Sequence, residues 1–151
     1  MTNASNALKI EVRPAEARDV TAIARLAGEL GYPSTAAEVR VRLAAVKEDP
    51  RHATFVAALT GDEVIGWIHL CEVHSPGSDP RAEIANLVVD SRFRSVGAGR
   101  LLVERGEQWA RKRGLAAIGV HSNIIRERAH VFYLRLGYAV TKSQKVFRKT
   151  L

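Results

Sequence analysis

The sequence predicts an α/β fold in which a mixed, mostly antiparallel sheet of six to seven strands is flanked by four helices. Some segments alternate apolar and polar residues, which is typical of strands, and others repeat apolar residues every three to four positions, as amphipathic helices do. A Gly61-Asp62 turn between two strand-like segments indicates an antiparallel hairpin in the middle of the chain. The expected order is β-α-α-β-β-β-α-β-α-β-β.

The first elements are a strand and two helices. Leu8 to Arg13 alternates in polarity and predicts a strand, and apolar spacing over Ala17 to Leu30 predicts a helix. Thr35 followed by Glu38 fits a capping box, which opens a second helix reaching Val46. The turn between the helices, residues 28–34, contains Tyr32, a candidate substrate contact.

The middle of the chain reads as three strands. Thr54 to Leu59 and Glu63 to Val73 form the predicted hairpin, and Gly66 inside it indicates a bulge or a close backbone approach. His74 to Arg81 holds two prolines, a glycine and two serines, so we expect a loop there. Ala82 to Val89 is the next predicted strand.

The last part of the chain predicts two helices and three short strands. A helix is expected from Ala98 to about Lys112, ended by Gly114. A second helix is expected over Arg126 to Leu136. The predicted strands are Leu115 to Val120, Tyr138 to Thr141 and Lys145 to Leu151.

Length and composition favour one soluble domain. The chain has 151 residues, no internal repeat and no linker-like segment, so we expect a single domain over residues 1–151 with a loose tail at residues 1–6. No apolar run is long enough for a membrane span, and the N-terminus lacks a signal-peptide pattern. The single cysteine, Cys71, excludes an internal disulfide and a cysteine metal cluster. We therefore expect a cytoplasmic protein without a metal.

Charge is unevenly distributed along the chain. The net charge is +7, but residues 1–90 hold 13 acidic and 9 basic side chains, whereas residues 91–151 hold 3 acidic and 14 basic ones. This division is expected if the basic half holds an anionic cofactor and the acidic half attracts a cationic substrate. A nucleic-acid partner is not expected, because no helix-turn-helix or aromatic-basic strand pattern accompanies the basic half.

The stretch from Val88 to Leu102 predicts an anion site. A strand runs into a loop with Gly97 and Gly99, after which a helix begins, so free backbone N–H groups and the positive helix end come together. A Walker A loop would need a Gly-Lys-Ser/Thr ending, but Arg100 and Leu101 follow Gly99. A dinucleotide fingerprint would need glycine where Leu102 stands.

The motifs along the chain resemble the Gcn5-related N-acetyltransferase family. Val89, Arg94, Gly97 and Gly99 match its V-x-x-x-x-R-x-x-G-x-G/A pattern. Val64-Ile65-Gly66-Trp67 resembles its V-V-G-aromatic step, and A-H-x-F-Y-x-x-x-G-Y from Ala129 to Tyr138 resembles its A-x-x-F-Y-x-x-x-G-F/Y segment. Ser95 and Val96 depart from the commoner glycine and basic or polar residues. The resemblance covers nearly the whole chain.

The resemblance implies acetyl-CoA as cosubstrate, held by the glycine loop and by the strand whose backbone pairs with the pantetheine arm. Glycine lets the backbone approach the phosphates closely, and arginines supply charge. The expected cofactor-binding residues are Leu87, Val88, Val89, Arg94, Ser95, Val96, Gly97, Ala98, Gly99, Arg100, Asn123 and Tyr133.

The resemblance also implies the catalytic groups. Tyr133 is expected to protonate the departing CoA thiolate, because a phenol is protonated at neutral pH. Glu83 is the candidate general base, acting through water, with Glu72 and His74 as alternatives. Strict alternation puts Glu83 on the face of Leu87 and Val89, although a bulge would change this. Glu72, His74 and Tyr32 are also candidate substrate contacts.

The expected reaction is direct transfer of an acetyl group to a primary amine. The pattern is most similar to bacterial members, including those related to aminoglycoside 6′-acetyltransferases, so the expected acceptor is a small cationic amine: an aminoglycoside, a polyamine or an amino-acid derivative. Two alternatives are a protein N-acetyltransferase and a non-catalytic acyl-CoA sensor. A homodimer is compatible with the sequence, and no membrane partner is expected.

Overall fold

The computed structural model describes residues 8–151, which form two compact units, residues 8–121 and residues 122–151. The predicted loose tail at residues 1–6 lies outside the described residues. Each unit is described by itself. No helix among residues 8–151 combines the length and the apolar character that crossing a membrane requires.

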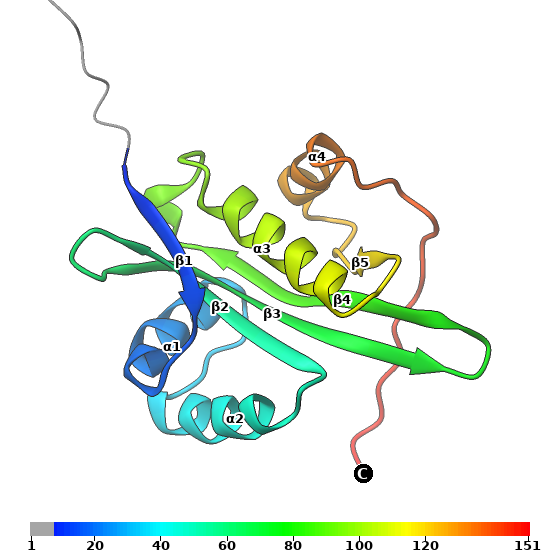
Figure 1. Cartoon of the computed structure of the whole chain (residues 1–151), viewed down its shortest axis with the longest axis horizontal. Helices are drawn as coiled ribbons and strands as arrows, with labels where there is room; N and C mark the ends of the chain where they lie inside the picture. Colours follow the sequence, from blue (N-terminus) through cyan, green and yellow to red (C-terminus); the bar gives the residue numbers. More distant parts are fainter. Residues whose placement is uncertain (1–7) are drawn as a thin grey trace, which may run out of the picture. The chain divides into compact units, whose positions relative to one another are not determined.

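The larger unit combines a sheet with three α-helices (Figure 1). Its elements in chain order are β1 (Ile10–Pro14), the 3-10 helix η1 (Ala17–Asp19), α1 (Val20–Glu29), α2 (Ala36–Glu48), β2 (His52–Leu59), β3 (Val64–Ser75), β4 (Ser78–Val89), the 3-10 helix η2 (Ser91–Phe93), α3 (Ala98–Lys112) and β5 (Ile118–Val120).

The sheet has five strands within the described residues, in the order β1-β2-β3-β4-β5. The first four strands pair antiparallel, and β5 pairs parallel to β4. The mixed, mostly antiparallel sheet is therefore confirmed, but the predicted count of six to seven strands is wrong. The strand predicted over Leu115 to Val120 is also shorter, because pairing with β4 begins only at Ile118.

Helices cover both faces of this sheet (Figure 1). The face under α1 and α2 buries Val56, Trp67 and Val88 against helix residues such as Leu26. The opposite face packs against α3, where the side chain of Leu70 reaches the backbone at Gly106. Burial of these apolar side chains is the main source of stability for the unit.

The predicted helix boundaries are largely confirmed. Thr35 and Glu38 form the capping box, in which the Glu38 N–H donates to Thr35 Oγ1 at 3.1 Å and the Thr35 N–H donates to a Glu38 carboxylate oxygen at 3.2 Å. Helix α3 spans Ala98 to Lys112 as expected, and Gly114 follows it with a positive φ of 73°. A left-handed backbone at that position favours glycine.

The loop predicted over His74 to Arg81 is wrong. β3 continues to Ser75 and β4 begins at Ser78, so only Pro76 and Gly77 form the turn. Pro80 is compatible with β4 because it lies where the pairing register shifts, between Val73↔Arg81 and Ser75↔Ser78. Proline has no backbone N–H to donate, and a bulge is a place in a strand where no such donor is needed.

The smaller unit contains one α-helix, α4 (Glu127–Arg135), followed by Gly137 with a φ of 91°. The strands predicted over 138–141 and 145–151 are absent from this part of the structure. Alternating polarity gives a segment strand propensity, but a strand also needs a neighbouring strand to accept its hydrogen bonds. Val146 and Phe147 are largely exposed here.

Gly66 on β3 lies where the backbone of β4 comes close, as the sequence indicated. A Cβ at this position would lie 2.9 Å from the carbonyl oxygen of Val88 and 3.2 Å from Cδ1 of Leu102 on α3. The register of β2 and β3 also shifts between Ala57 and Ala58, beside this glycine. A side chain at residue 66 would therefore push apart β4 and α3.

We expect Gly66→Ala to lower the free energy of unfolding by about 1–3 kcal/mol, the usual cost of overpacking a core. Gly28→Ala is the matched control, because no atom lies within 4 Å of a Cβ there and residue 28 is helical. Alanine should stabilise α1 by about 0.5–1 kcal/mol. Urea unfolding measures both, and equal effects of the two changes would contradict the close approach.

Candidate functional site

The end of β4 is fixed by a buried carboxylate. Asp90 is fully buried and accepts hydrogen bonds from the Arg25 side chain at 2.9 Å and from the Arg92 side chain at 2.8 Å and backbone N–H at 3.0 Å. Its own N–H donates to the Ile65 carbonyl at 2.7 Å. The hydrogen bonds from Arg92 hold the pKa of Asp90 well below its usual range, so the carboxylate is charged at neutral pH. The strand therefore ends at a defined position.

The loop after Asp90 is held to α1 and then turns sharply. The Ser91 N–H donates to a Glu29 carboxylate oxygen at 3.1 Å. Ser95 has a φ of 66° and Gly97 a φ of 93°, so the backbone passes twice through the left-handed region before α3 begins. Glycine adopts this conformation without the steric cost of a Cβ, which explains the glycine at residue 97.

The first turn of α3 is an anion-binding geometry. Leu101 is the first residue whose N–H donates to a carbonyl of this turn, the Gly97 carbonyl at 3.1 Å, so the N–H groups of Ala98, Gly99 and Arg100 have no intrahelical acceptor. The helix dipole adds positive potential at the same place. The side chains of Arg94 and Arg100 are exposed beside it, as are Ser95 and Val96.

The edge of β4 next to this loop is open in the sheet. β5 pairs with β4 only from Ala82 to Ile84. On the side of β4 that faces away from β3, no strand among the described residues pairs with residues 85–89. Along an antiparallel strand, residues whose backbone groups bond to the neighbouring strand alternate with residues whose backbone groups point away from it. The Asp90 N–H bonds to Ile65 of β3, so every second residue before Asp90, starting with Val89, points away from β3. The backbone groups of Leu87 and Val89 therefore point toward the open edge.

Val88 is placed differently from its neighbours Leu87 and Val89. It pairs with Trp67 of β3 and buries its side chain in the core under α1 and α2. The same alternation directs its backbone groups to β3. Of the three strand residues predicted to bind the cofactor, Leu87 and Val89 reach the open edge and Val88 does not.

A β-bulge at Ala85 determines the face on which Glu83 lies. His69 pairs with Asn86 and Leu70 with Ile84, so Ala85 is an extra residue in β4. Strict alternation would put Glu83 on the face of Leu87 and Val89, under α3. The extra residue reverses this relation. Glu83 instead pairs with Cys71 and shares the α1/α2 face with Asn86.

The neighbours of Glu83 are charged or titratable. Its carboxylate lies 3.7 Å from the Arg81 guanidinium and 4.0 Å from Nδ1 of His121. Cys71 lies beside it, and burial raises the pKa of that thiol, so the thiol is protonated at neutral pH. A protonated thiol is a poor nucleophile.

Glu72 and His74, the other candidates for base and substrate contact, lie elsewhere. The Arg113 Nε donates to a Glu72 carboxylate oxygen at 2.6 Å, and His74 Nε2 lies 2.9 Å from the other oxygen. The bond from Arg113 lowers the pKa of Glu72. Arg113 follows the C-terminal end of α3, a helix about 22 Å long at 1.5 Å per residue, so this pair is far from the glycine loop.

Tyr32 is mostly exposed in the turn between α1 and α2. Its N–H donates to the Ala27 carbonyl at 3.0 Å and its carbonyl accepts from the Ser34 hydroxyl at 3.2 Å. The ring is thus presented outward on a backbone fixed by these two bonds, a position from which a side chain can contact a ligand.

The smaller unit contains the remaining predicted site residues. Tyr133 lies on α4, where its ring makes edge contacts with Phe132 and Tyr138 at centroid distances of 5.1 and 5.7 Å. Burial raises the pKa of the Tyr133 phenol, so it is protonated at neutral pH. Asn123 precedes the helix, and its carbonyl lies 2.9 Å from Nε2 of His130.

A pair of histidines on the α1/α2 face has no counterpart in the sequence motifs. Nδ1 of His52 on β2 lies 2.9 Å from Nε2 of His69 on β3, and the rings stack with centroids 5.2 Å apart. His69 is also hydrogen-bonded to the side chain of Asn86. Their separation of 17 residues gave no motif, and only the register of the hairpin brings them together.

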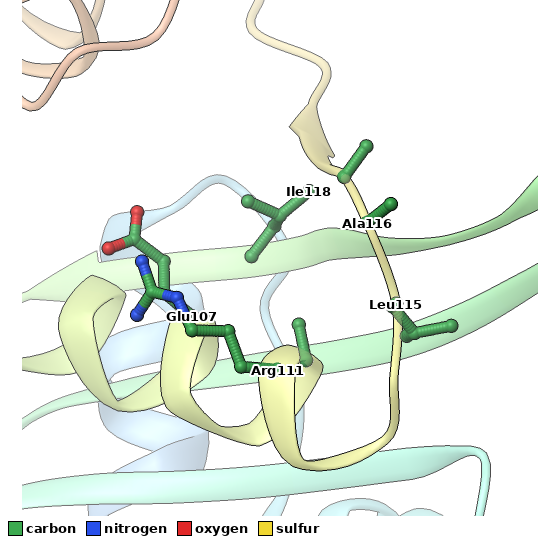
Figure 2. Close-up of a pocket in the computed structure, with 7 residues that line it drawn as sticks. Glu107, Arg111, Leu115, Ala116 and Ile118 are labelled. Carbon is green, nitrogen blue, oxygen red and sulfur yellow. The ribbon is translucent and has the colours of Figure 1, made fainter.

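Two small pockets lie away from the glycine loop. One, of about 120 Å³, lies between the C-terminal half of α3 and the segment leading to β5, and is lined by residues including Glu107, Arg111 and Leu115 (Figure 2). The other, of about 250 Å³, is bordered by Val46, His52 and their neighbours. Within residues 8–151, no three His, Cys, Asp or Glu side chains are grouped as metal ligands.

Comparison with known proteins identifies relatives of this chain. Residues 19–138 match the model of the acetyltransferase (GNAT) family. The chain is 37% identical over 67 residues to an uncharacterized N-acetyltransferase of Bacillus subtilis, YhdJ, and 38% identical over 82 residues to an aminoalkylphosphonate N-acetyltransferase of Salmonella typhimurium. These alignments span 44% and 54% of this chain, and about half of each relative, 46% and 53%.

Solved structures show the same fold. An aminoglycoside N-acetyltransferase, AAC(6′)-Iy, solved in complex with CoA, superposes with a TM-score of 0.84 over 98% of this chain and 99% of that one. The sequence identity is 16%, so this likeness concerns the fold.

We expect Asp90→Asn to lower the free energy of unfolding by about 1.5–3 kcal/mol at pH 7, the usual contribution of hydrogen bonds to a charged group. Because the pKa of Asp90 is lowered by folding, its stabilisation is complete above its ordinary pKa of about 4 and is lost as the pH falls. The deficit of the variant should therefore shrink between pH 5 and pH 3.

Urea unfolding across this pH range measures the effect. Asp79→Asn is the control, because Asp79 is exposed on β4 and a surface change of this kind has little effect. A deficit for Asp90→Asn that is the same at pH 3 and pH 7 would contradict the charged anchor.

Proposed function

The chain belongs to the GNAT family of acetyltransferases, and we propose that it transfers an acetyl group from acetyl-CoA directly to the primary amine of a small cationic acceptor. One observation carries the proposal: the free N–H groups at the start of α3 and the outward backbone of Leu87 and Val89 adjoin along one edge of the larger unit. The first suits a pyrophosphate and the second an extended pantetheine arm with its amide groups.

The proposed cofactor contacts follow from this arrangement. Arg94 and Arg100 supply charge for the phosphates, and Gly97 keeps the left-handed turn that presents the N–H groups. Ser95, Val96, Ala98 and Gly99 complete the loop. Two further proposed cofactor contacts, Asn123 and Tyr133, belong to the smaller unit. We therefore also propose that residues 1–151 act as one domain.

In the proposed mechanism, Glu83 attracts the acceptor ammonium by its charge and is the candidate base, acting through water. The deprotonated amine attacks the thioester carbonyl carbon, the C–S bond breaks, and the Tyr133 phenol gives its proton to the sulfur. The raised pKa of Tyr133 supports this role, because the group must be protonated at neutral pH to act as the acid.

The proposed acceptor class rests on charge and on the relatives. Residues 1–90 are acidic on balance, which favours a cationic amine such as an aminoglycoside, a polyamine or an amino-acid derivative. One relative is named for aminoalkylphosphonates, which also carry a primary amine. We also propose that the protein is cytoplasmic and forms a homodimer.

An acceptor panel tests the proposal. Acetyl-CoA is incubated with the protein and with aminoglycosides, polyamines, amino-acid amides, an aminoalkylphosphonate and a peptide with a free N-terminus, and released thiol and acetylated product are measured. We expect turnover on a small cationic amine. Turnover on the peptide alone would indicate a protein N-acetyltransferase, and CoA binding without turnover would indicate a sensor.

We expect Tyr133→Phe to lower kcat by about 100-fold, within the usual range for a general acid, while CoA affinity is retained. The change removes one hydroxyl and keeps the ring packing of α4. Tyr138→Phe, in the same aromatic group, is the control and should keep its activity. Steady-state kinetics and calorimetry separate the two effects, and undiminished turnover in Tyr133→Phe would show that another group is the acid.

A further inference from the structure

A row of polar side chains crosses the α1/α2 face of the sheet. Asn86 on β4 pairs with His69 on β3, and His69 lies 2.9 Å from His52 on β2. Nε2 of His52 lies 3.9 Å from the Asp49 carboxylate, which follows α2 at the surface. The row therefore runs from the strand beside the open edge to solvent, across three strands.

The row begins next to the place where the proposed acetyl transfer occurs. Asn86 directly precedes Leu87, whose backbone faces the open edge, and one residue of strand spans about 3.3 Å. The bulge at Ala85 puts Asn86 and Glu83 on the same face. An ammonium attracted by Glu83 would therefore lie on the face that carries this row.

We propose that His52 and His69, the relay pair, take up the proton that the acceptor ammonium loses and pass it to solvent at Asp49. This inference rests on the proposed function and assigns the proton a path that Glu83 alone does not supply. Glu83 then serves mainly to attract the ammonium, because its carboxylate already lies beside the cationic Arg81.

The state of His69 suits this role. Burial, with a smaller effect of the neighbouring His52, lowers the pKa of His69, so its ring is neutral at neutral pH and can accept a proton. The bond to Asn86 orients the ring. Between Nδ1 of His52 and Nε2 of His69 there is room for one proton, so a proton gained by one ring displaces the shared proton toward the other.

The charges around the relay pair favour release at the Asp49 end. A side-chain hydrogen bond from Arg51 lowers the pKa of Asp49 to about 2, so this carboxylate is charged at neutral pH, and it lies 3.9 Å from Nε2 of His52. Lys47 of α2 borders the same pocket as His52, but its ammonium donates to the Ala15 carbonyl at 2.9 Å.

Other titratable or charged groups also lie on this face. They include Cys71, whose thiol is protonated, Glu83 with Arg81, Arg13 of β1 with the buried Asp19 at 2.8 Å, and the α1 residues Arg25 and Glu29, which are bonded to Asp90 and Ser91 at the end of β4.

The atoms balance in this scheme. The ammonium N–H bond breaks and its proton goes to the relay pair, after which the nitrogen lone pair forms the bond to the carbonyl carbon and the C–S bond breaks. The nitrogen loses a second proton to solvent as the amide forms. The sulfur gains one from Tyr133, which recovers it from solvent. One proton is released overall for each acetyl group transferred.

The kinetic test compares His69→Gln and His52→Gln with Glu83→Gln. For the two histidine variants we expect kcat at pH 7 to fall by about 100-fold with unchanged CoA affinity, because a proton acceptor contributes about that much. Raising the pH toward 10, where the amine itself loses its proton, should restore most of the rate. Glu83→Gln should instead raise KM for the amine. Glu48→Gln, an exposed change on α2, is the control.

The second measurement needs no turnover: ¹⁵N NMR of the histidine rings in the unliganded protein, titrated from pH 8 to pH 5. The relay pair predicts a neutral His69 ring at pH 7, one proton shared between Nδ1 of His52 and Nε2 of His69, and ¹⁵N signals of the two rings that change together. Independent titration would overturn the relay even if the enzyme is active, as would an unchanged pH profile in His69→Gln. If the two rings share a proton but the protein acetylates no amine, the proposed function is wrong. The relay pair then has no proton to take up from an acceptor, and its proposed role is also wrong.

Discussion

The buried carboxylate of Asp90 holds together the parts on which the site depends. It accepts hydrogen bonds from Arg25 of α1 and Arg92 of η2, while its own N–H donates to the β3 backbone. A buried charge is costly unless it is fully paired, so the carboxylate keeps these groups in one arrangement. The end of β4, the glycine loop and the start of α3 are positioned from this point.

The extra residue at Ala85 divides β4 into two parts with different tasks. On the loop side, Leu87 and Val89 offer backbone groups to the open edge and face α3. On the other side of the bulge, Glu83 faces α1 and α2, the same face that Asn86 occupies on the loop side. One strand thereby separates the proposed cofactor edge from the proposed acceptor face, which is the kind of reorientation that bulges produce next to functional sites.

Local patterns predicted much of this arrangement. The capping box at Thr35, the bounds of α3 and the close approach at Gly66 follow from short-range chemistry that the sequence displays directly. The loop predicted over His74 to Arg81 was wrong, because Pro80 fits a strand where the pairing register shifts. The closing strands failed because polarity does not reveal whether a partner strand is available.

Long-range features were beyond a single sequence. The face of Glu83 depends on a bulge that strict alternation cannot locate, and Val88 was grouped with Leu87 and Val89 although its backbone belongs to β3. His52 and His69 meet only through the register of β2 and β3. Asp90 carried a weak signal, an aspartate directly after an apolar strand, whereas Arg25 lies 65 residues away in sequence.

Amide hydrogen exchange with and without CoA tests most directly whether the glycine loop and the β4 edge form the cofactor seat. The predicted result is added protection of the Leu87 and Val89 amides and of those at residues 97–100, with Val88 unchanged because its N–H already pairs with β3. Protection confined to other segments, such as the pocket between α3 and β5, would contradict the assignment.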